Sequence, residues 1–120
     1  MPPRRRTDPQ AGRAAVAAWR ADPAAIDRRT RGTAVRFTLE ELAARAPGHT
    51  VEVRVPPFGV TQCVEGPRHK RGTPPNVIET DADTWLSLVT GASTWADALR
   101  EGTVRASGQR AVLSDLLPLL

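Results

Sequence analysis

Apolar residues follow a helical period through the first part of the chain. An Ala-rich stretch from 11 to 21 predicts one helix, and a stretch from about 27 to 46 predicts a second. Pro23 separates the two, because proline cannot continue a helix and disfavours helical backbone in the residue before it. A Pro-Gly pair ends the second stretch. The capping pattern of Thr38 and Glu41 leaves open a break within that helix.

From residue 50 the period changes to two. Residues 50–55, TVEVRV, alternate apolar with polar side chains, which predicts a half-buried strand. The turn PPFG at 56–59 leads to a second predicted strand at 60–64. A long polar loop at 65–75 precedes a third strand at 76–80.

Two short capped helices follow the third strand. The first carries Trp85 and Leu88 on its apolar side and ends at Gly91. The second has the sequence WADALRE and ends at Gly102. Side chains that can cap the first turns of these helices stand directly before them. These candidates are Thr80 or Asp81 for the first helix and Ser93 or Thr94 for the second.

The chain then predicts one more strand at 103–107, a turn at Gly108 and a final apolar helix at about 110–117. Three strands, a helical pair and a further strand indicate an α+β fold whose helices cover one face of a sheet. Charge does not change this picture. Residues 1–10, MPPRRRTDPQ, are expected to form a disordered basic tail, and residues 11–120 a single domain.

The excess positive charge belongs to one end of the chain. The net charge is +4, yet residues 1–36 hold nine Arg against three Asp, so the remainder is slightly acidic. A nucleic-acid-binding domain carries a basic face through its folded part, so nucleic acid is not expected as a partner. The cluster Arg68, His69, Lys70 and Arg71 could bind an anionic head group or an acidic partner, but a solvated loop tip is the preferred explanation.

Candidate chemistry is sparse. Cys63 is the single cysteine, which excludes an internal disulfide and suits a reducing compartment, so a cytoplasmic location is expected. Cys63, His49 and His69 lack the spacing of a metal site. No nucleophile elbow or phosphate-binding loop occurs. No catalytic residue, metal or cofactor is therefore predicted.

A family resemblance rests on the last forty residues. A helix with an apolar face, a glycine, a short second helix and another glycine precede a strand of the type x-V-x-x-x-G, and a last apolar helix follows. In that order the stretch resembles the C-terminal half of the sterol carrier protein type 2 family, and the whole chain looks like its compact bacterial members. The matching positions are Trp85, Leu88, Gly91, Trp95, Ala98, Gly102, Val104, Gly108 and Leu113.

This resemblance implies a mixed five-stranded sheet covered by helices around an apolar tunnel. The residues alone predict four strands, so the fifth would have to come from residues assigned here to loops. The resemblance also implies non-catalytic binding or transfer of an apolar ligand: a lipid, a fatty-acyl group or a sterol-like molecule. The candidate ligand-binding residues are Trp85, Leu88, Val89, Trp95, Leu99, Val104, Leu113, Leu116 and Leu117.

Two alternatives stay open at this point. Each candidate ligand residue can be an ordinary core residue instead. The same fold can also be an interaction or accessory module that pairs with an enzyme or with a second copy as a homodimer, since the leucines near the C-terminus are a candidate exposed patch. No segment is long and apolar enough to span a membrane, so membrane contact is expected to be transient at most.

Overall fold

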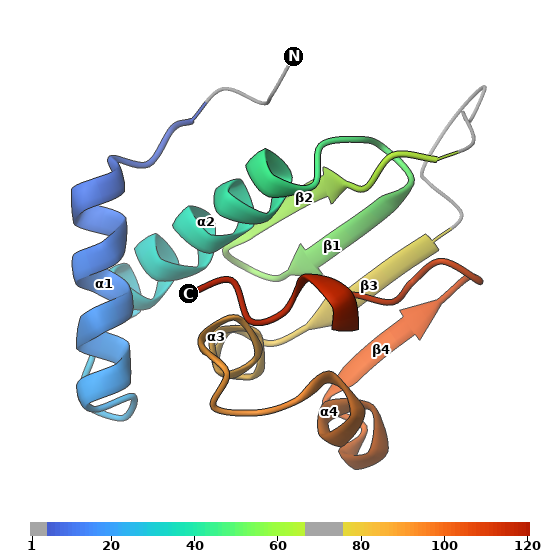
Figure 1. Cartoon of the computed structure of the whole chain (residues 1–120). Coiled ribbons are helices and arrows are strands. Elements are labelled where there is room, and N and C mark those ends of the chain that lie inside the picture. The colour runs from blue at the N-terminus through green and yellow to red at the C-terminus, as the bar shows by residue number, and fades with distance from the viewer. Residues whose placement is uncertain (1–4, 67–75) are drawn as a thin grey trace.

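A four-stranded mixed sheet organises the part of the chain that the computed structural model describes, which is residues 5–66 and 76–120 (Figure 1). The strand order is β2-β1-β3-β4. β1 pairs with β2 as an antiparallel hairpin and with β3 in parallel, and β4 is antiparallel to β3. The strands are β1 (Val51–Val55), β2 (Gly59–Cys63), β3 (Asn76–Thr80) and β4 (Val104–Ser107).

Four α-helices and one 3₁₀ turn complete the described fold. The predicted caps form: Asp81 accepts the backbone N–H of Thr84, and Thr94 accepts that of Asp97. Gly91 and Gly102 close their helices in the left-handed conformation that glycine adopts without a steric cost. The elements are α1 (Pro9–Ala21), α2 (Arg28–Arg45), α3 (Ala82–Thr90), α4 (Trp95–Glu101) and η1 (Ser114–Leu116).

The alternation of β1 divides the sheet into a core face and an open face. Val51, Val53 and Val55 are fully buried, together with Ile78 of β3, and they pack in one cluster with apolar residues of α2 and α3. On the other face Glu52 and Arg54 stay partly exposed and form an ion pair. The period of two therefore predicted the buried face of this strand correctly.

Hydrogen bonds from buried tryptophans tie the helices to one another. The indole N–H of Trp85 in α3 donates to the buried hydroxyl of Thr38 in α2 at 2.8 Å. The indole N–H of Trp19 in α1 donates to Asp83 of α3 at 2.9 Å, and Arg31 of α2 reaches the same carboxylate at 3.2 Å. Both indole donors are thus satisfied, as buried polar groups require.

The structure places the start of the first helix before the predicted Ala11 and settles the break that the sequence left open in the second helix. α1 begins at Pro9 with Asp8 as its cap. Residues 5–7 lie along α2, where Arg5 pairs with Glu41, and Glu40 accepts two backbone N–H groups. α2 is continuous, because Thr38 bonds back to carbonyl oxygens of its own helix instead of starting a new one.

The sheet has four strands in the described residues, not the five that the family resemblance implied. The connection between β2 and β3 contains prolines at 67, 74 and 75. That stretch includes residues 67–75, which lie outside the described part of the chain, as do residues 1–4. The basic cluster at 68–71 therefore lies outside it too.

The final helix predicted at 110–117 is also wrong. The structure has only the turn η1 there, within an otherwise irregular segment. Pro118 biases Leu117 away from helical backbone. At the other end the backbone N–H of Arg110 donates to the side chain of Asn76, which holds the segment against β3. Apolar spacing alone did not reveal either constraint.

Candidate functional site

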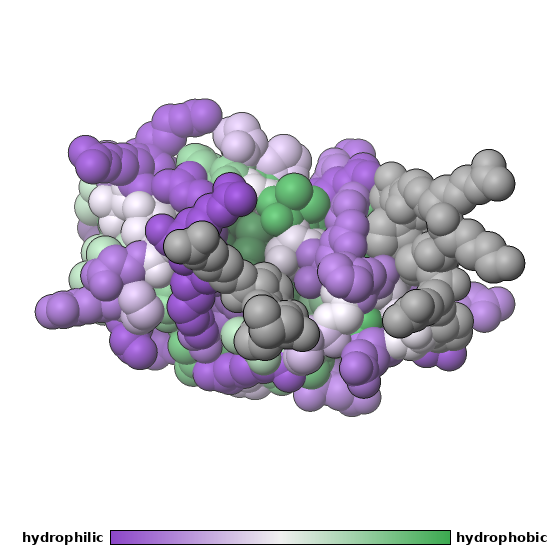
Figure 2. Space-filling model, turned by 90° about the horizontal axis from the view of Figure 1, so that it is seen from above, coloured by the Kyte–Doolittle hydropathy of each residue, from purple (hydrophilic) through white to green (hydrophobic). Residues whose placement is uncertain are grey.

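An apolar hollow of about 460 Å³ lies where α2 and β2 end and the C-terminal segment passes. Its volume is within the range of about 300–1,000 Å³ that is typical of small-molecule sites. Figure 2 looks onto this end of the molecule and shows hydrophobic surface near its middle with hydrophilic groups around it. The hollow is lined by Ala46, Pro47, Val64, Glu65, Val112, Asp115 and Leu116.

One wall of the hollow is a strained and tightly packed backbone. Val64 has φ 67°, a left-handed conformation that β-branched residues rarely adopt. Two hydrogen bonds hold it there: its N–H donates to Ala46 O at 2.7 Å, and its carbonyl accepts from Thr50 at 3.1 Å. Gly48 permits the close approach, since a Cβ at that position would lie 2.1 Å from Val64 O. Strain of this kind concentrates at functional sites.

The opposite wall is the C-terminal segment, which is fixed mainly at its two ends. Arg110 is held by Asn76, whose amide also donates to Thr50 O at 3.0 Å. At the far end the N–H groups of Leu119 and Leu120 both donate to Val89 O of α3. Within the described residues, the backbone hydrogen bonds between these anchors are local to the segment. We refer to residues 111–118 as the strap.

The strap places its leucines at different depths. Leu113 is fully buried, and Leu119, the first residue after the strap, is nearly so. Leu116 and Leu117 between them are half-buried. Val112 at the rim of the hollow is 53% exposed. A segment with a buried leucine near each end and half-buried residues between them can cover an apolar hollow without filling it.

The sequence-predicted ligand residues do not gather around this hollow. Leu116 is the one that lines it. Leu99 is 44% exposed on α4 and lies outside the core cluster. Leu117 packs partly buried against that cluster. The other six are core residues in the described structure: Trp85, Leu88, Val89, Trp95, Val104 and Leu113. Their lining of a cavity stays a prediction.

The lining residues that the sequence analysis missed come from the ends of elements. Pro47 and Ala46 were assigned to the end of a helix, and Val64 to the end of a strand. Val112 was assigned to a helix that does not form. No periodic pattern distinguishes such positions, because they meet only through tertiary contacts.

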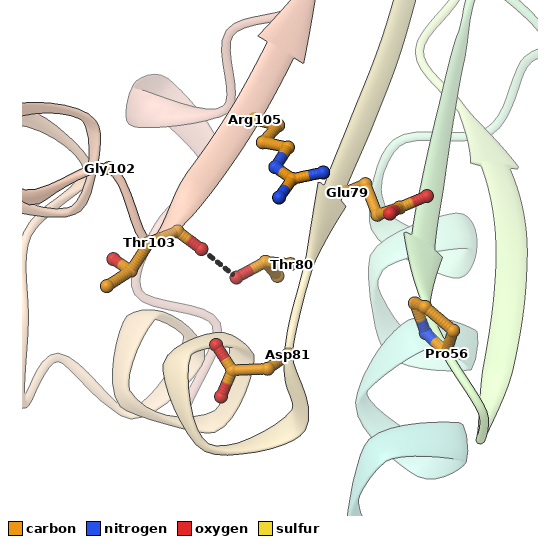
Figure 3. Close-up of a pocket in the computed structure, with 7 residues that line it drawn as sticks. All are labelled: Pro56, Glu79, Thr80, Asp81, Gly102, Thr103 and Arg105. Atoms are coloured by element: carbon orange, nitrogen blue, oxygen red, sulfur yellow. Dashed lines mark hydrogen bonds between the residues drawn. The ribbon is translucent and has the colours of Figure 1, made fainter.

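Two further hollows lie on the open face of the sheet. One of about 340 Å³ is formed around Glu79, Asp81 and Arg105, and Thr80 donates to Thr103 O beside it (Figure 3). The other, of about 450 Å³, extends from Glu79 to the exposed Val60. Three charged side chains line each of these hollows, whereas Glu65 and Asp115 are the two that line the apolar hollow.

Reactive groups are not part of the apolar hollow. The thiol of Cys63 is fully buried on the core face of β2, and burial raises its pKa to about 12. It is therefore protonated at neutral pH and cannot act as a thiolate nucleophile. In residues 5–66 and 76–120 no group of three His, Cys, Asp or Glu side chains is placed to hold a metal ion.

None of the helices in residues 5–66 and 76–120 is long and apolar enough to cross a bilayer.

A search among curated proteins finds no match to the chain. A family model described as "Bacterial SCP ortholog" matches residues 27–119, from the start of α2 to the second anchor of the strap. The match includes every residue that lines the apolar hollow.

Proposed function

Because the chain belongs to the family of bacterial sterol carrier protein orthologs, we propose that it binds an apolar ligand non-covalently in the hollow beneath the strap. The observation that carries the proposal is the hollow itself, walled by Val64 on one side and Leu116 on the other. The ligand class is a lipid, a fatty-acyl group or a sterol-like molecule. The protein sequesters or transfers this ligand and does not transform it chemically.

The lining favours a long apolar group with a small polar end. Ala46, Pro47 and Val64 offer carbon surface, while Glu65 and Asp115 stand at the edge. These two carboxylates disfavour an anionic head group close to them and favour a neutral or cationic one. Little further polar selectivity is expected, since apolar contacts are non-directional.

Movement of the strap would let the ligand enter the hollow. Its anchors at Arg110 and Leu119 leave the stretch around Leu116 with local hydrogen bonds only. Outward movement of this stretch extends the hollow toward Leu113 and the core residues beneath it. The predicted ligand residues of α3 then lie next to the apolar end of the ligand.

The apolar surface that a ligand buries on binding determines the expected affinity. Burying about 400 Å² of apolar ligand surface contributes roughly 10 kcal/mol at about 25 cal/mol per Å². Association costs at least about 4 kcal/mol. The remaining ~6 kcal/mol corresponds to a dissociation constant in the tens of micromolar. Reversible carriage between donors and acceptors suits an affinity of this size.

A fluorescent neutral lipid tests the proposal. NBD-labelled methyl stearate, titrated with protein from which lipid has been extracted, should bind with a dissociation constant in the tens of micromolar. Val112→Asp places a charge at the apolar rim and should weaken binding at least about tenfold. Ala17→Asp, an equally charged change at an exposed position of α1, is the matched control and should bind like the native protein.

Other outcomes count against the proposal. Absence of probe uptake by the native protein would refute the carrier function. Undiminished uptake by folded Val112→Asp would place the ligand elsewhere. If Val112→Asp changed the mass of the assembly in light scattering but left probe uptake unchanged, the hollow would be a protein-interaction surface instead.

A further inference from the structure

The turn between β1 and β2 presents apolar side chains to solvent. Pro56 and Pro57 are exposed, and Val60 is 59% exposed on the open face of the sheet. The half-buried Phe58 lies between them, and its N–H donates to Val55 O at 2.9 Å, which closes the turn. A large exposed aliphatic side chain beside two exposed prolines is a candidate contact surface.

Arginines from the first half of α2 flank this turn. The guanidinium of Arg28 lies 5.3 Å from the centroid of the Phe58 ring, in the geometry of a cation–π contact. Arg36 lies close to the same ring and to Gly59. A Cβ added at Gly32 would lie 2.9 Å from the Phe58 ring and 3.0 Å from the Arg36 guanidinium, and one added at Gly59 would lie 3.7 Å from Arg36 Cγ. Arg29 is exposed on the adjoining turn of α2.

These three arginines carry free positive charge. The ion pairs found in the described residues involve Arg5, Arg31, Arg45, Arg54 and Arg100, and none of the arginines beside the turn. The nearest acid along the chain, Asp27, caps α2 by accepting the backbone N–H of Thr30 at 2.7 Å. We call Pro56, Pro57, Phe58 and Val60 with Arg28, Arg29 and Arg36 the hairpin tip.

We propose that the hairpin tip docks the protein on the surface of an anionic lipid bilayer. The arginines match the negative charge of phosphate-bearing head groups, and long arginine side chains keep their charge at that level while apolar neighbours go deeper. Val60 and the two prolines then enter the boundary between head groups and acyl chains. A nucleic acid would engage the arginines but leave these apolar side chains in water.

The docking surface is separate from the apolar hollow. The hairpin tip lies beside the N-terminal half of α2, whereas the hollow lies at the C-terminal end of that helix (Figure 1). When the hairpin tip contacts the bilayer, the strap therefore lies away from that contact. Membrane docking does not require that the hollow bind lipid, so the two proposals can fail independently.

Vesicle flotation tests the proposal with the intact chain. The native protein should float with vesicles of phosphatidylcholine and phosphatidylglycerol at low salt, and not with phosphatidylcholine alone. Each arginine near an anionic surface contributes about fivefold to partitioning, so the double variant Arg28→Glu with Arg36→Glu should bind at least about 25-fold more weakly. Val60→Asp alone should reduce binding several-fold.

Matched variants distinguish docking from net charge. Arg13→Glu with Arg105→Glu changes the charge equally at exposed positions of α1 and β4, at arginines that form no ion pair within the described residues, and should float like the native protein. Equal losses in both double variants would overturn the proposal, because the effect would follow net charge only. Failure of the native protein to float, or binding to an acidic polypeptide in preference to the vesicles, would also overturn it.

Discussion

Gly12→Ala sets helix propensity against packing at one position of α1. Alanine in place of glycine ordinarily stabilises a helix interior by about 1 kcal/mol. Gly12, however, is buried against α2, and an added Cβ would lie 2.2 Å from Cγ and 2.6 Å from Cβ of Phe37. Phe37 is only 1% exposed. Rotating its ring cannot relieve a contact with its own Cβ, so α1 and α2 must move apart.

The expected net effect is a loss of about 2 kcal/mol in the free energy of unfolding, the upper end of the packing cost less the gain in propensity. Overpacking a filled interior costs about 1–3 kcal/mol and more where backbone must shift, which outweighs the gain in propensity. Moving α1 also loosens the contacts of Trp19 beneath it. A domain with a stability of about 5–15 kcal/mol would still fold, so the loss is measurable.

Urea unfolding followed by tryptophan fluorescence measures this loss. With a denaturant slope of about 2 kcal/mol per molar, the midpoint should fall by about 1 M. Ala17→Gly, at an exposed position of the same helix, gives the propensity term separately. Phe37→Leu should cost less in the Gly12→Ala background than alone. A Gly12→Ala protein as stable as the native one would refute the close packing of α1 on α2.

Three further predictions follow from buried groups. Burial raises the pKa of Cys63 to about 12 in the folded protein, against an ordinary 9.0. The free energy of unfolding therefore keeps its full value below pH 9 and falls as pH rises from 9 toward 12, by up to about 1.4 kcal/mol per pH unit. With no Tyr and a single Lys in the chain, Cys63→Ala should remove most of this slope from urea midpoints measured between pH 8 and 11. Thr38→Val leaves the buried indole N–H of Trp85 unpaired and should cost about 1–3 kcal/mol, whereas adding Trp85→Phe should cost less than it does in the native background. Asp83→Ala removes the acceptor of the Trp19 indole N–H and should lower the free energy of unfolding by about 1 kcal/mol in urea unfolding. Asp83→Asn keeps an acceptor and should lower it less.

The elements that the sequence predicted correctly are those with local determinants. Asp81 and Thr94 cap their helices from adjacent positions, and Gly91 and Gly102 end them. The strand at 51–55 follows from alternation alone. Such signals act within a few residues, so tertiary contacts did not overrule them.

The candidate site had no comparable local signal. Its walls come from the end of α2, the residue after β2 and the strap, which meet only after folding. The left-handed backbone at Val64 depends on a glycine sixteen positions away in the sequence. Of the predicted ligand residues, Leu116 alone reached the hollow, because the predictions followed a resemblance in α3 and α4 where the described structure packs a core.

The missing C-terminal helix is connected to the existence of the hollow. A helix over 110–117 would bring Leu113, Leu116 and Leu117 onto one face, and that face would close against the sheet as a continuous apolar stripe. The strap instead buries Leu113, Leu119 is buried just after it, and Leu116 between them stays half-buried beside the residue that follows β2. These leucines therefore cross the hollow without filling it. The irregular, non-helical strap is what gives an apolar ligand its place in the proposed site.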